Sequence, residues 1–335
     1  LAAAFGIIPP MPLSPRAVGT LAAVVTVALW TGFIIVGRAS AAHTLTPFDL
    51  ALVRLLGAAA VLLPWGLWLT RRGGPAHGRG SLWGLSPLPL KPTALTGLFG
   101  GLLYSVLCYA GFFYAPAAHG SVLMPGSLPL WAGFLAVPLL GERLTRMRVL
   151  ALACIALGGA VVGGAGLLTA LDGGAVWKGD AIFVCAAFCW SMYSVLARRF
   201  ALEPVPATVA ITAFGVLCYA PLFALGAGLG WLPSHLRAAP WGEIFGQALF
   251  QGVGVVVVAG ITFVAMIQAF GPVRTTMLTA LVPGLSALGA VALLGEPLGW
   301  NGVAGLVLVT GGILLGVRAA PPVPPPAASG ENAVT

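Results

Sequence analysis

The chain has 335 residues, of which 59% are hydrophobic and only 7% are charged, and its formal net charge is +8. Soluble domains carry about 25% charged residues, so this composition excludes a water-soluble globular enzyme. Intrinsic disorder is excluded as well, because disordered segments are polar and poor in apolar residues. The apolar runs are continuous rather than alternating, which favours membrane-spanning helices over the strands of a membrane barrel.

Ten apolar stretches are long enough to cross a bilayer, since a helical span needs about 20 such residues. The connections between them are short, which makes consecutive helices antiparallel neighbours. We therefore predict an all-α integral membrane protein with ten transmembrane helices. The expected spans are 17–37, 47–69, 93–114, 120–140, 149–169, 179–197, 207–229, 244–270, 275–294 and 300–317.

The basic residues are distributed unevenly over the connections. With the N-terminus inside, the inner segments hold twelve Lys and Arg residues and the outer segments hold three, Arg38, Lys178 and Arg237. Cytoplasmic loops carry the excess of basic residues in helical membrane proteins, so we expect an inner (plasma) membrane protein with both termini cytoplasmic. The twelve are Arg16, Arg71, Arg72, Arg79, Lys91, Arg143, Arg146, Arg148, Arg198, Arg199, Arg274 and Arg318.

The fourth and ninth spans end alike. Both finish in Leu-Leu-Gly-Glu, at Glu142 and Glu296, and a proline stands 13 positions before each glutamate, at Pro129 and Pro283. The two segments are 154 residues apart. Four residues per segment recur at one spacing, together with a shared proline, which indicates an internal repeat.

The first and sixth spans also correspond. Trp30 and Arg38 match Trp190 and Arg198 at an offset of 160 residues. The difference of six residues between the two offsets fits an insertion in the basic loop 71–92 of the first half. Span one therefore matches span six, and span four matches span nine.

Each repeat has five spans. Because five is odd, the second repeat must enter the membrane from the opposite side, which is the inverted-repeat architecture of many secondary transporters. We expect a cytosolic N-terminal segment (1–16), a first repeat (17–169), a second, inverted repeat (179–317) and a Pro-rich flexible tail (318–335). Ala39-Ser40-Ala41 would suit a signal-peptide cleavage site, but the repeat includes this segment, which favours a retained span.

On these repeated residues, the chain resembles the EamA-type members of the drug/metabolite transporter superfamily over about residues 17–318. The resemblance implies ten helices around a central cavity, with the fifth and tenth helices at the periphery. It also implies export or exchange of small metabolites. Among the members, amino-acid exporters of the YddG type are most similar in span number and in cavity aromatics.

Aromatic and polar side chains at mid-depth are the candidates for substrate binding, because an indole or phenol in lipid is better placed inward. Few charges accompany them, so the pocket favours neutral, zwitterionic or aromatic substrates over sugar phosphates. Ordinary helix packing is the alternative for each. The candidates are Trp30, Arg54, Tyr104, Tyr109, Trp131, Trp190, Tyr193 and Gln251.

Arg54 is the one basic residue well inside a span. Buried charges in membranes are costly and are usually functional or paired. Asp49 precedes it by five residues and so does not share its helix face. Three interpretations stay open: snorkelling toward the outer surface, structural pairing, and contact with an anionic group of the substrate.

Several other residues carry structural expectations. Pro129 and Pro283 interrupt their helices and are candidate gating hinges, with a static bend as the alternative. Glu142 and Glu296 are expected to accept hydrogen bonds from the start of the following helix. His119 is expected in a surface loop.

No cofactor, metal site or nucleic-acid partner is predicted. The five cysteines lie inside apolar runs without further ligands nearby, and no soluble basic domain could hold a phosphate backbone. The expected partners are the bilayer and a small-molecule substrate. Small residues four apart, Gly159 with Gly163 and Gly312 with Gly316, favour packing inside a monomer, with a weak homodimer as the alternative.

These patterns together predict a secondary transporter that exports or exchanges small organic solutes, most favourably amino acids or related metabolites, by alternating access. An organic-cation or drug exporter of the same fold is the first alternative. An integral-membrane enzyme is disfavoured because no Ser/His/Asp grouping, HExxH segment or phosphate-binding glycine loop is present. A channel is disfavoured by the inverted repeat.

Overall fold

The computed structural model describes residues 14–72, 80–170 and 174–318. Most of the expected N-terminal segment, part of the basic loop and the Pro-rich tail therefore lie outside the described residues. Within them, ten helical segments are long and apolar enough to cross a membrane, as predicted. Apart from an isolated bridge between Ser81 and Ser86, the described elements are helical.

The first five spans are built from α1 to α7. The first, second and fifth spans are single helices, whereas the third and fourth are each made of shorter pieces. The elements are α1 (Pro15–Ala39), η2 (Ser40–Ala42), α2 (Pro47–Arg72), η4 (Leu82–Gly84), α3 (Leu90–Thr96), η5 (Gly97–Leu103), α4 (Tyr104–Ala110), η6 (Gly111–Phe113), α5 (Ala117–Leu123), α6 (Leu128–Leu140) and α7 (Arg146–Ala170).

The second five spans follow the same plan. The eighth span is again composite, and a helix break again divides the segment that precedes the second Leu-Leu-Gly-Glu. The elements are α8 (Val176–Arg199), α9 (Pro204–Gly228), α10 (Trp241–Gln247), η7 (Ala248–Val258), α11 (Ala259–Thr279), α12 (Leu281–Leu294) and α13 (Trp300–Arg318).

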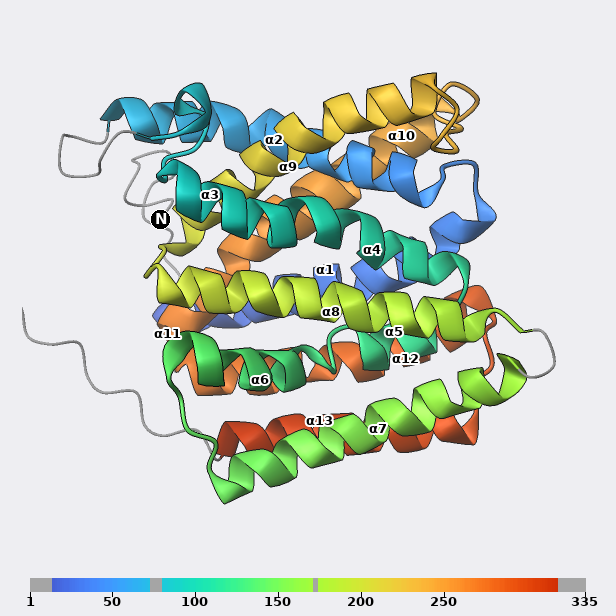
Figure 1. The fold of residues 1–335 in the computed structure, drawn as a ribbon. Helices are drawn as coiled ribbons and strands as arrows, with labels where there is room; N and C mark the ends of the chain where they lie inside the picture. Colours follow the sequence, from blue (N-terminus) through green and yellow to red (C-terminus); the bar gives the residue numbers. More distant parts are fainter. Residues whose placement is uncertain (1–13, 73–79, 171–173, 319–335) are drawn as a thin grey trace, which may run out of the picture.

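Helices of the two halves pack in equivalent pairs (Figure 1). α2 packs against α9, and α7 lies beside α13 at one edge of the bundle. α1 packs against α11 and α12, while α8 packs against α4 and α6. This exchange of contacts is what two similar units produce when they are related by an axis in the membrane plane.

The third and eighth spans both contain a π-helical segment at the same repeat position. When the offset of 154 residues is added to the limits of η5, the resulting segment lies inside η7. Glycine allows close backbone approach at each: a Cβ on Gly101 would lie 2.2 Å from the Ile211 carbonyl oxygen of α9, and one on Gly252 would lie 2.7 Å from the Ala58 nitrogen of α2. π-Helical turns are frequent at functional sites.

The recurring prolines follow breaks in the helices. A proline clashes with the carbonyl group four residues earlier and lacks an N–H of its own, and α11 ends at Thr279, four residues before Pro283. Pro129 occupies the first turn of α6, after the break at 124–127. The connection expected at 271–274 is part of a helix, because α11 continues through it and ends only inside the ninth span.

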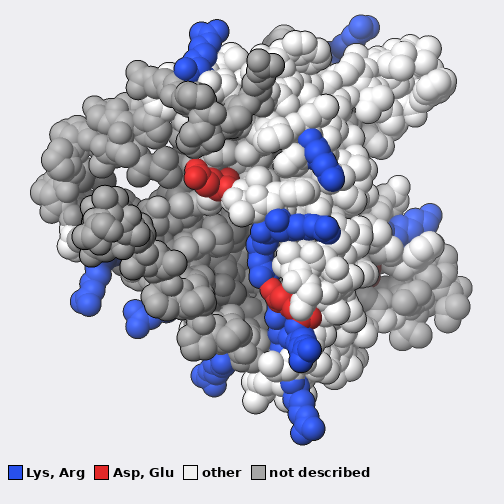
Figure 2. Space-filling view, turned by 60° about the vertical axis from the view of Figure 1, so that its left-hand side comes forward, with Lys and Arg blue, Asp and Glu red and all other residues white. Residues whose placement is uncertain are grey.

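The two ends of the bundle differ in charge. One end, called the basic end below, holds Arg71, Lys91, Arg146 and Arg198 near the helix termini. Figure 2 turns this end forward and shows Lys and Arg side chains spread over it. The opposite end holds Arg38 and Lys178. Each end therefore carries helix termini from both halves.

Candidate functional site

Arg54 is buried in the interior of the helix bundle. It lies seven residues after the start of α2, which is about 10 Å along the helix axis at 1.5 Å per residue. Only 7% of the residue is exposed. The side chain therefore does not snorkel to the surface, and that interpretation is wrong.

Three aromatic rings from two other helices surround the Arg54 guanidinium. Its central carbon lies 5.4 Å from the Phe33 ring centre, 5.6 Å from that of Tyr104 and 5.9 Å from that of Tyr109. The Arg54 Nη1 group also donates a long hydrogen bond of 3.5 Å to the Tyr109 hydroxyl. Ring contacts of this kind contribute up to about 2 kcal/mol when desolvated, less than the several kcal/mol that burying an ion costs.

Asp49 forms no ion pair with Arg54, and both of its carboxylate oxygens accept hydrogen bonds from other groups. Oδ2 accepts hydrogen bonds from the Thr46 backbone and hydroxyl and from the His235 backbone, each 2.9 Å long. Oδ1 accepts one from the Ser234 hydroxyl at 2.6 Å. Asp49 thus fastens the 233–235 segment to the start of α2, and it is not the ion-pair partner of Arg54.

A row of rings extends from Arg54 toward the second half of the chain. Tyr104 packs on Trp190 of α8 with ring centres 4.7 Å apart, and Trp190 packs on Tyr193 at 5.1 Å. Tyr109 is fully buried and contacts Phe33 edge to face at 6.0 Å. Five of the predicted site residues, one of them Arg54, therefore lie in one continuous cluster made by both repeats.

Two predicted tryptophans lie outside this cluster. Trp30 contacts Phe263 of α11, with ring centres 5.1 Å apart. Trp131 contacts Phe188 of α8 at 5.3 Å, and its indole N–H is buried without a hydrogen-bond partner. Repeat symmetry pointed to Trp30 and Trp190; of these two, Trp190 packs on a ring of the Arg54 cluster, whereas the ring contact of Trp30 is with Phe263.

Gln251 is 1% exposed, and neither atom of its carboxamide has a partner. It stands in η7 next to Gly252, whose added Cβ would lie 2.8 Å from the Arg54 carbonyl oxygen. Gln251 is therefore at the same level of the bundle as Arg54. Buried polar groups are normally hydrogen-bonded, so this carboxamide is a candidate for contact with a ligand.

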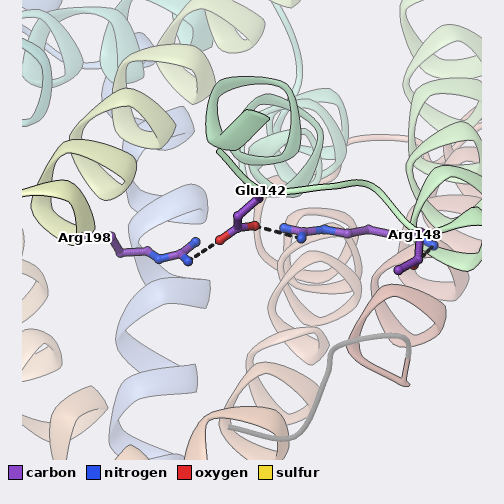
Figure 3. Close-up of polar contacts among 4 residues, drawn as sticks. Glu142, Arg148 and Arg198 are labelled. Carbon is purple, nitrogen blue, oxygen red and sulfur yellow. Dashed lines mark hydrogen bonds and ion pairs between the residues drawn. The ribbon is translucent and has the colours of Figure 1, made fainter. Parts of the chain in front are cut away.

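At the basic end, one ion pair joins the two repeats. Glu142 follows α6, and its carboxylate accepts hydrogen bonds from Arg198 at the end of α8 and, at 2.9 Å, from Arg148 of α7 (Figure 3). The bond from Arg198, and then that from Arg148, lowers the pKa of Glu142, while partial burial opposes this shift. The first repeat supplies the acid and the second supplies Arg198.

At the opposite end, the equivalent residues form the equivalent ion pair. Glu296 follows α12 and binds Arg38 at the end of α1. Arg38 also donates to the Phe112 carbonyl oxygen at 2.7 Å, and the second Glu296 oxygen accepts from the Ala117 N–H at 2.8 Å. Here the second repeat supplies the acid and the first supplies the arginine.

Comparison with known proteins identifies the family that has this arrangement of helices. The model of the EamA-like transporter family matches residues 17–164 and again residues 177–318. The chain belongs to the EamA-like transporter family. It is therefore a multi-pass membrane protein with the two-repeat fold and transport function of that family.

Two further comparisons found similar proteins. The EamA-like chain is 26% identical to the "Uncharacterized transporter YyaM" of Bacillus subtilis (strain 168) over 225 residues, which is 66% of this chain and 70% of that protein. A crystal structure of another protein superposes with a TM-score of 0.57 at 25% identity, covering 91% of this chain and 99% of the other.

The glutamates of this EamA-like transporter do not have the predicted role. Neither is shown to accept a bond from the start of the following helix backbone: Glu142 binds two arginine side chains, and Glu296 binds Arg38 and the amide at the start of α5. The sequence contained a signal for these ion pairs, because an arginine and a glutamate recur at matched positions of both repeats. Spacing along the chain could not show that each arginine meets the glutamate of the other repeat.

His119 is not in a surface loop. It belongs to α5, and its Nδ1 atom lies 2.8 Å from Asp180 Oδ1 of α8. Both side chains are largely buried. The turn expected before the fourth span is displaced because α5 already begins at Ala117.

The described residues do not show the central cavity, which stays a prediction. An open pocket of about 490 Å³ lies instead between α1 and α10–η7, on the side of the end that holds Arg38. None of the predicted site residues lines it. Its lining residues are Val36, His43, Pro240, Gly242, Glu243, Gly246, Gln247 and Phe250.

Proposed function

We propose that this EamA-like transporter exports or exchanges small organic solutes, most favourably amino acids or related metabolites, by alternating access of its two repeats. Its activity is then transport and not catalysis. One observation carries the proposal: equivalent arginine–glutamate pairs, exchanged between the repeats, join the molecule at both ends. The proposed location is the inner membrane with both termini cytoplasmic, since cytoplasmic connections are the basic ones.

The ion pairs suit gates that open and close. The side chains of the pair at the basic end are 60% exposed for Arg198 and 26% for Glu142, and those of the other pair are 30% exposed for Arg38 and 14% for Glu296. Exposed ion pairs contribute at most about 1 kcal/mol, so the pair at the basic end can break without unfolding the helices that it joins. In alternating access, the pair at one end opens while the other stays formed, and repeat symmetry makes the two open states equivalent.

The proposed substrate route runs along the cluster of rings near Arg54 and the half-buried aromatic residues beside it. A weakly polar surface of this kind favours neutral, zwitterionic or aromatic solutes. An exporter of drugs or organic cations is the second candidate, because electron-rich rings also attract cations. The proposed lining residues are Trp30, Arg54, Tyr104, Tyr109, Trp131, Trp190, Tyr193 and Gln251.

Crosslinking each gate tests the mechanism. In a background without the five native cysteines, one variant carries Arg38→Cys with Glu296→Cys, and another carries Glu142→Cys with Arg198→Cys. After reconstitution into liposomes, a reducible thiol crosslinker should stop counterflow of radiolabelled amino acids in either variant, and reduction should restore it. The four single-cysteine variants, treated alike, are the controls.

Three results would count against the proposal. Continued flux through a crosslinked variant would exclude alternating access at that end. Single-channel currents in a planar bilayer would indicate a channel. Counterflow of organic cations but of no amino acid would favour the second candidate.

A further inference from the structure

The cation of Arg54 has no carboxylate partner among the described residues. Of the eight acidic residues, Asp172 and Glu331 lie outside the described part of the chain. The other six are engaged elsewhere or exposed. Asp49 binds the 233–235 segment, Glu142 and Glu296 form the gates, Asp180 binds His119, Glu243 accepts from the Leu45 amide, and Glu203 is exposed.

A second buried group, in the adjacent segment η7, lacks hydrogen-bond partners. The Gln251 carboxamide offers two N–H donors and one acceptor oxygen, and the structure gives neither atom a hydrogen bond. Its backbone neighbour Gly252 packs on the Arg54 carbonyl. One uncompensated cation and one unpartnered amide therefore occur at the same level, on helices of opposite repeats.

We propose that Arg54 is the anion site for the transported solute and binds its carboxylate group. This inference rests on the transport function proposed above and names the substrate class: small carboxylates, zwitterionic or anionic, with an apolar or aromatic body. The rings of Phe33, Tyr104 and Trp190 would contact that body. Gln251 would hydrogen-bond a polar group of the same solute.

The chemistry of the guanidinium supports a carboxylate ligand in particular. Its planar N–H groups match the two oxygens of a carboxylate, and such bidentate pairs are among the strongest hydrogen bonds. The same fixed positive charge repels an ammonium group that lacks a neighbouring carboxylate. Arg54 thus discriminates between the two candidate functions, because it favours amino acids and disfavours organic cations.

A ligand series separates the groups that Arg54 would recognise. Binding to the purified full-length protein in nanodiscs is measured by titration calorimetry for phenylalanine, 3-phenylpropionate, phenylalanine amide and phenethylamine. We expect the two carboxylates to bind and the two compounds without a carboxylate to bind at least tenfold more weakly. The same comparison with the remaining amino acids and their amides covers solutes with other side chains.

Variants assign the effect to Arg54. Arg54→Gln should weaken carboxylate binding by about tenfold to a hundredfold, the range for losing a charged hydrogen bond, and Arg54→Lys should fall between because it keeps the charge without the fork. Arg237→Gln, the same substitution at an exposed loop position, is the matched control. Size-exclusion profiles and thermal unfolding establish that each variant is folded.

A measurement on the unmutated protein does not depend on how the variants fold. Arginine stays protonated at all accessible pH values, so 3-phenylpropionate binding should weaken as its own carboxyl group is protonated. Equal binding of acids and amides, a preference for amines, or equal affinities of the wild type and a folded Arg54→Gln variant would each overturn the carboxylate site.

Binding and transport results separate this inference from the transport function. If carboxylates bind through Arg54 but no counterflow occurs in liposomes, the site stands and the transport proposal fails. If amines are transported and carboxylates neither bind nor move, transport stands and the carboxylate site fails.

Discussion

The residues that distinguish the two ends of this molecule are the partners of its paired glutamates. Glu142 binds two arginine side chains, whereas Glu296 binds one arginine and the Ala117 backbone amide. The basic end is therefore held by two charged contacts and the other end by one charged contact plus a neutral donor. Replacing Glu142 by Gln would therefore remove two charged contacts, whereas replacing Glu296 by Gln would remove one.

Glu142 should make stability depend on pH. Its folded-state pKa lies below the unfolded value, so its contribution is complete above the unfolded pKa and is lost as the pH falls through the folded one. At pH values below about 4.5, the midpoint temperature of thermal unfolding should decrease more in the wild type than in Glu142→Gln. The difference should correspond to about 1 kcal/mol or less.

The matched control is Glu203→Gln, at an exposed acid of the same end that is not in an ion pair among the described residues. Its melting profile should follow that of the wild type. Parallel profiles for the wild type and Glu142→Gln between pH 3 and pH 7 would contradict the assignment.

At the scale of helices, the pair α7–α13 depends on small residues. A Cβ on Gly312 would lie 2.8 Å from the Ala151 carbonyl oxygen, and Gly158 and Gly305 meet each other's backbones in the same way. Gly159 and Gly163, which were expected to form this contact, make no such close approach. The position of each glycine around its helix decides this, and the four-residue spacing alone does not.

Gly312→Ala should destabilise the bundle by about 1–3 kcal/mol, because the added methyl group overlaps the backbone of α7. Gly311→Ala is the control, since a Cβ there meets nothing within 4 Å. Chemical unfolding of both variants in detergent measures the difference. Equal unfolding midpoints for the two variants would show that α7 and α13 pack less closely than described.

The helix breaks before Pro129 and Pro283 should affect the rate of transport. Alanine at either position removes the constraint that stops the helix, so Pro129→Ala and Pro283→Ala should slow counterflow severalfold without lowering thermal stability. Pro138→Ala tests the same change inside α6, where the proline has no repeat counterpart, and should leave the rate unchanged. Identical rates in all three variants would mean that the breaks are static bends.

At the scale of the whole molecule, the distribution of charge predicts how the bundle sits in the membrane. Arg143 lies at the basic end and Arg237 at the opposite end, and both are exposed. In cells, a membrane-impermeant maleimide should label Arg237→Cys and not Arg143→Cys, in a background without native cysteines. Permeabilised cells, in which both should react, are the control, and the reverse pattern would invert the proposed orientation.

Much of the architecture could be predicted from the sequence, because it depends on properties that are local along the chain. The ten spans follow from hydropathy and from the fixed thickness of a bilayer. The two-repeat organisation follows from matched prolines, tryptophans and Leu-Leu-Gly-Glu segments. Both are confirmed by the helices and by the family match to each half.

Contacts between the repeats were decided by the tertiary structure alone. Arg38 meets Glu296 across 258 positions of the chain, and Arg54 lies among rings that α1 and α4 supply. No local pattern encodes which faces of distant helices meet, because that depends on how two inverted units pack together. For the same reason, Trp131 and Trp190 are equally plausible in sequence, yet only Trp190 lies beside the rings around the buried arginine.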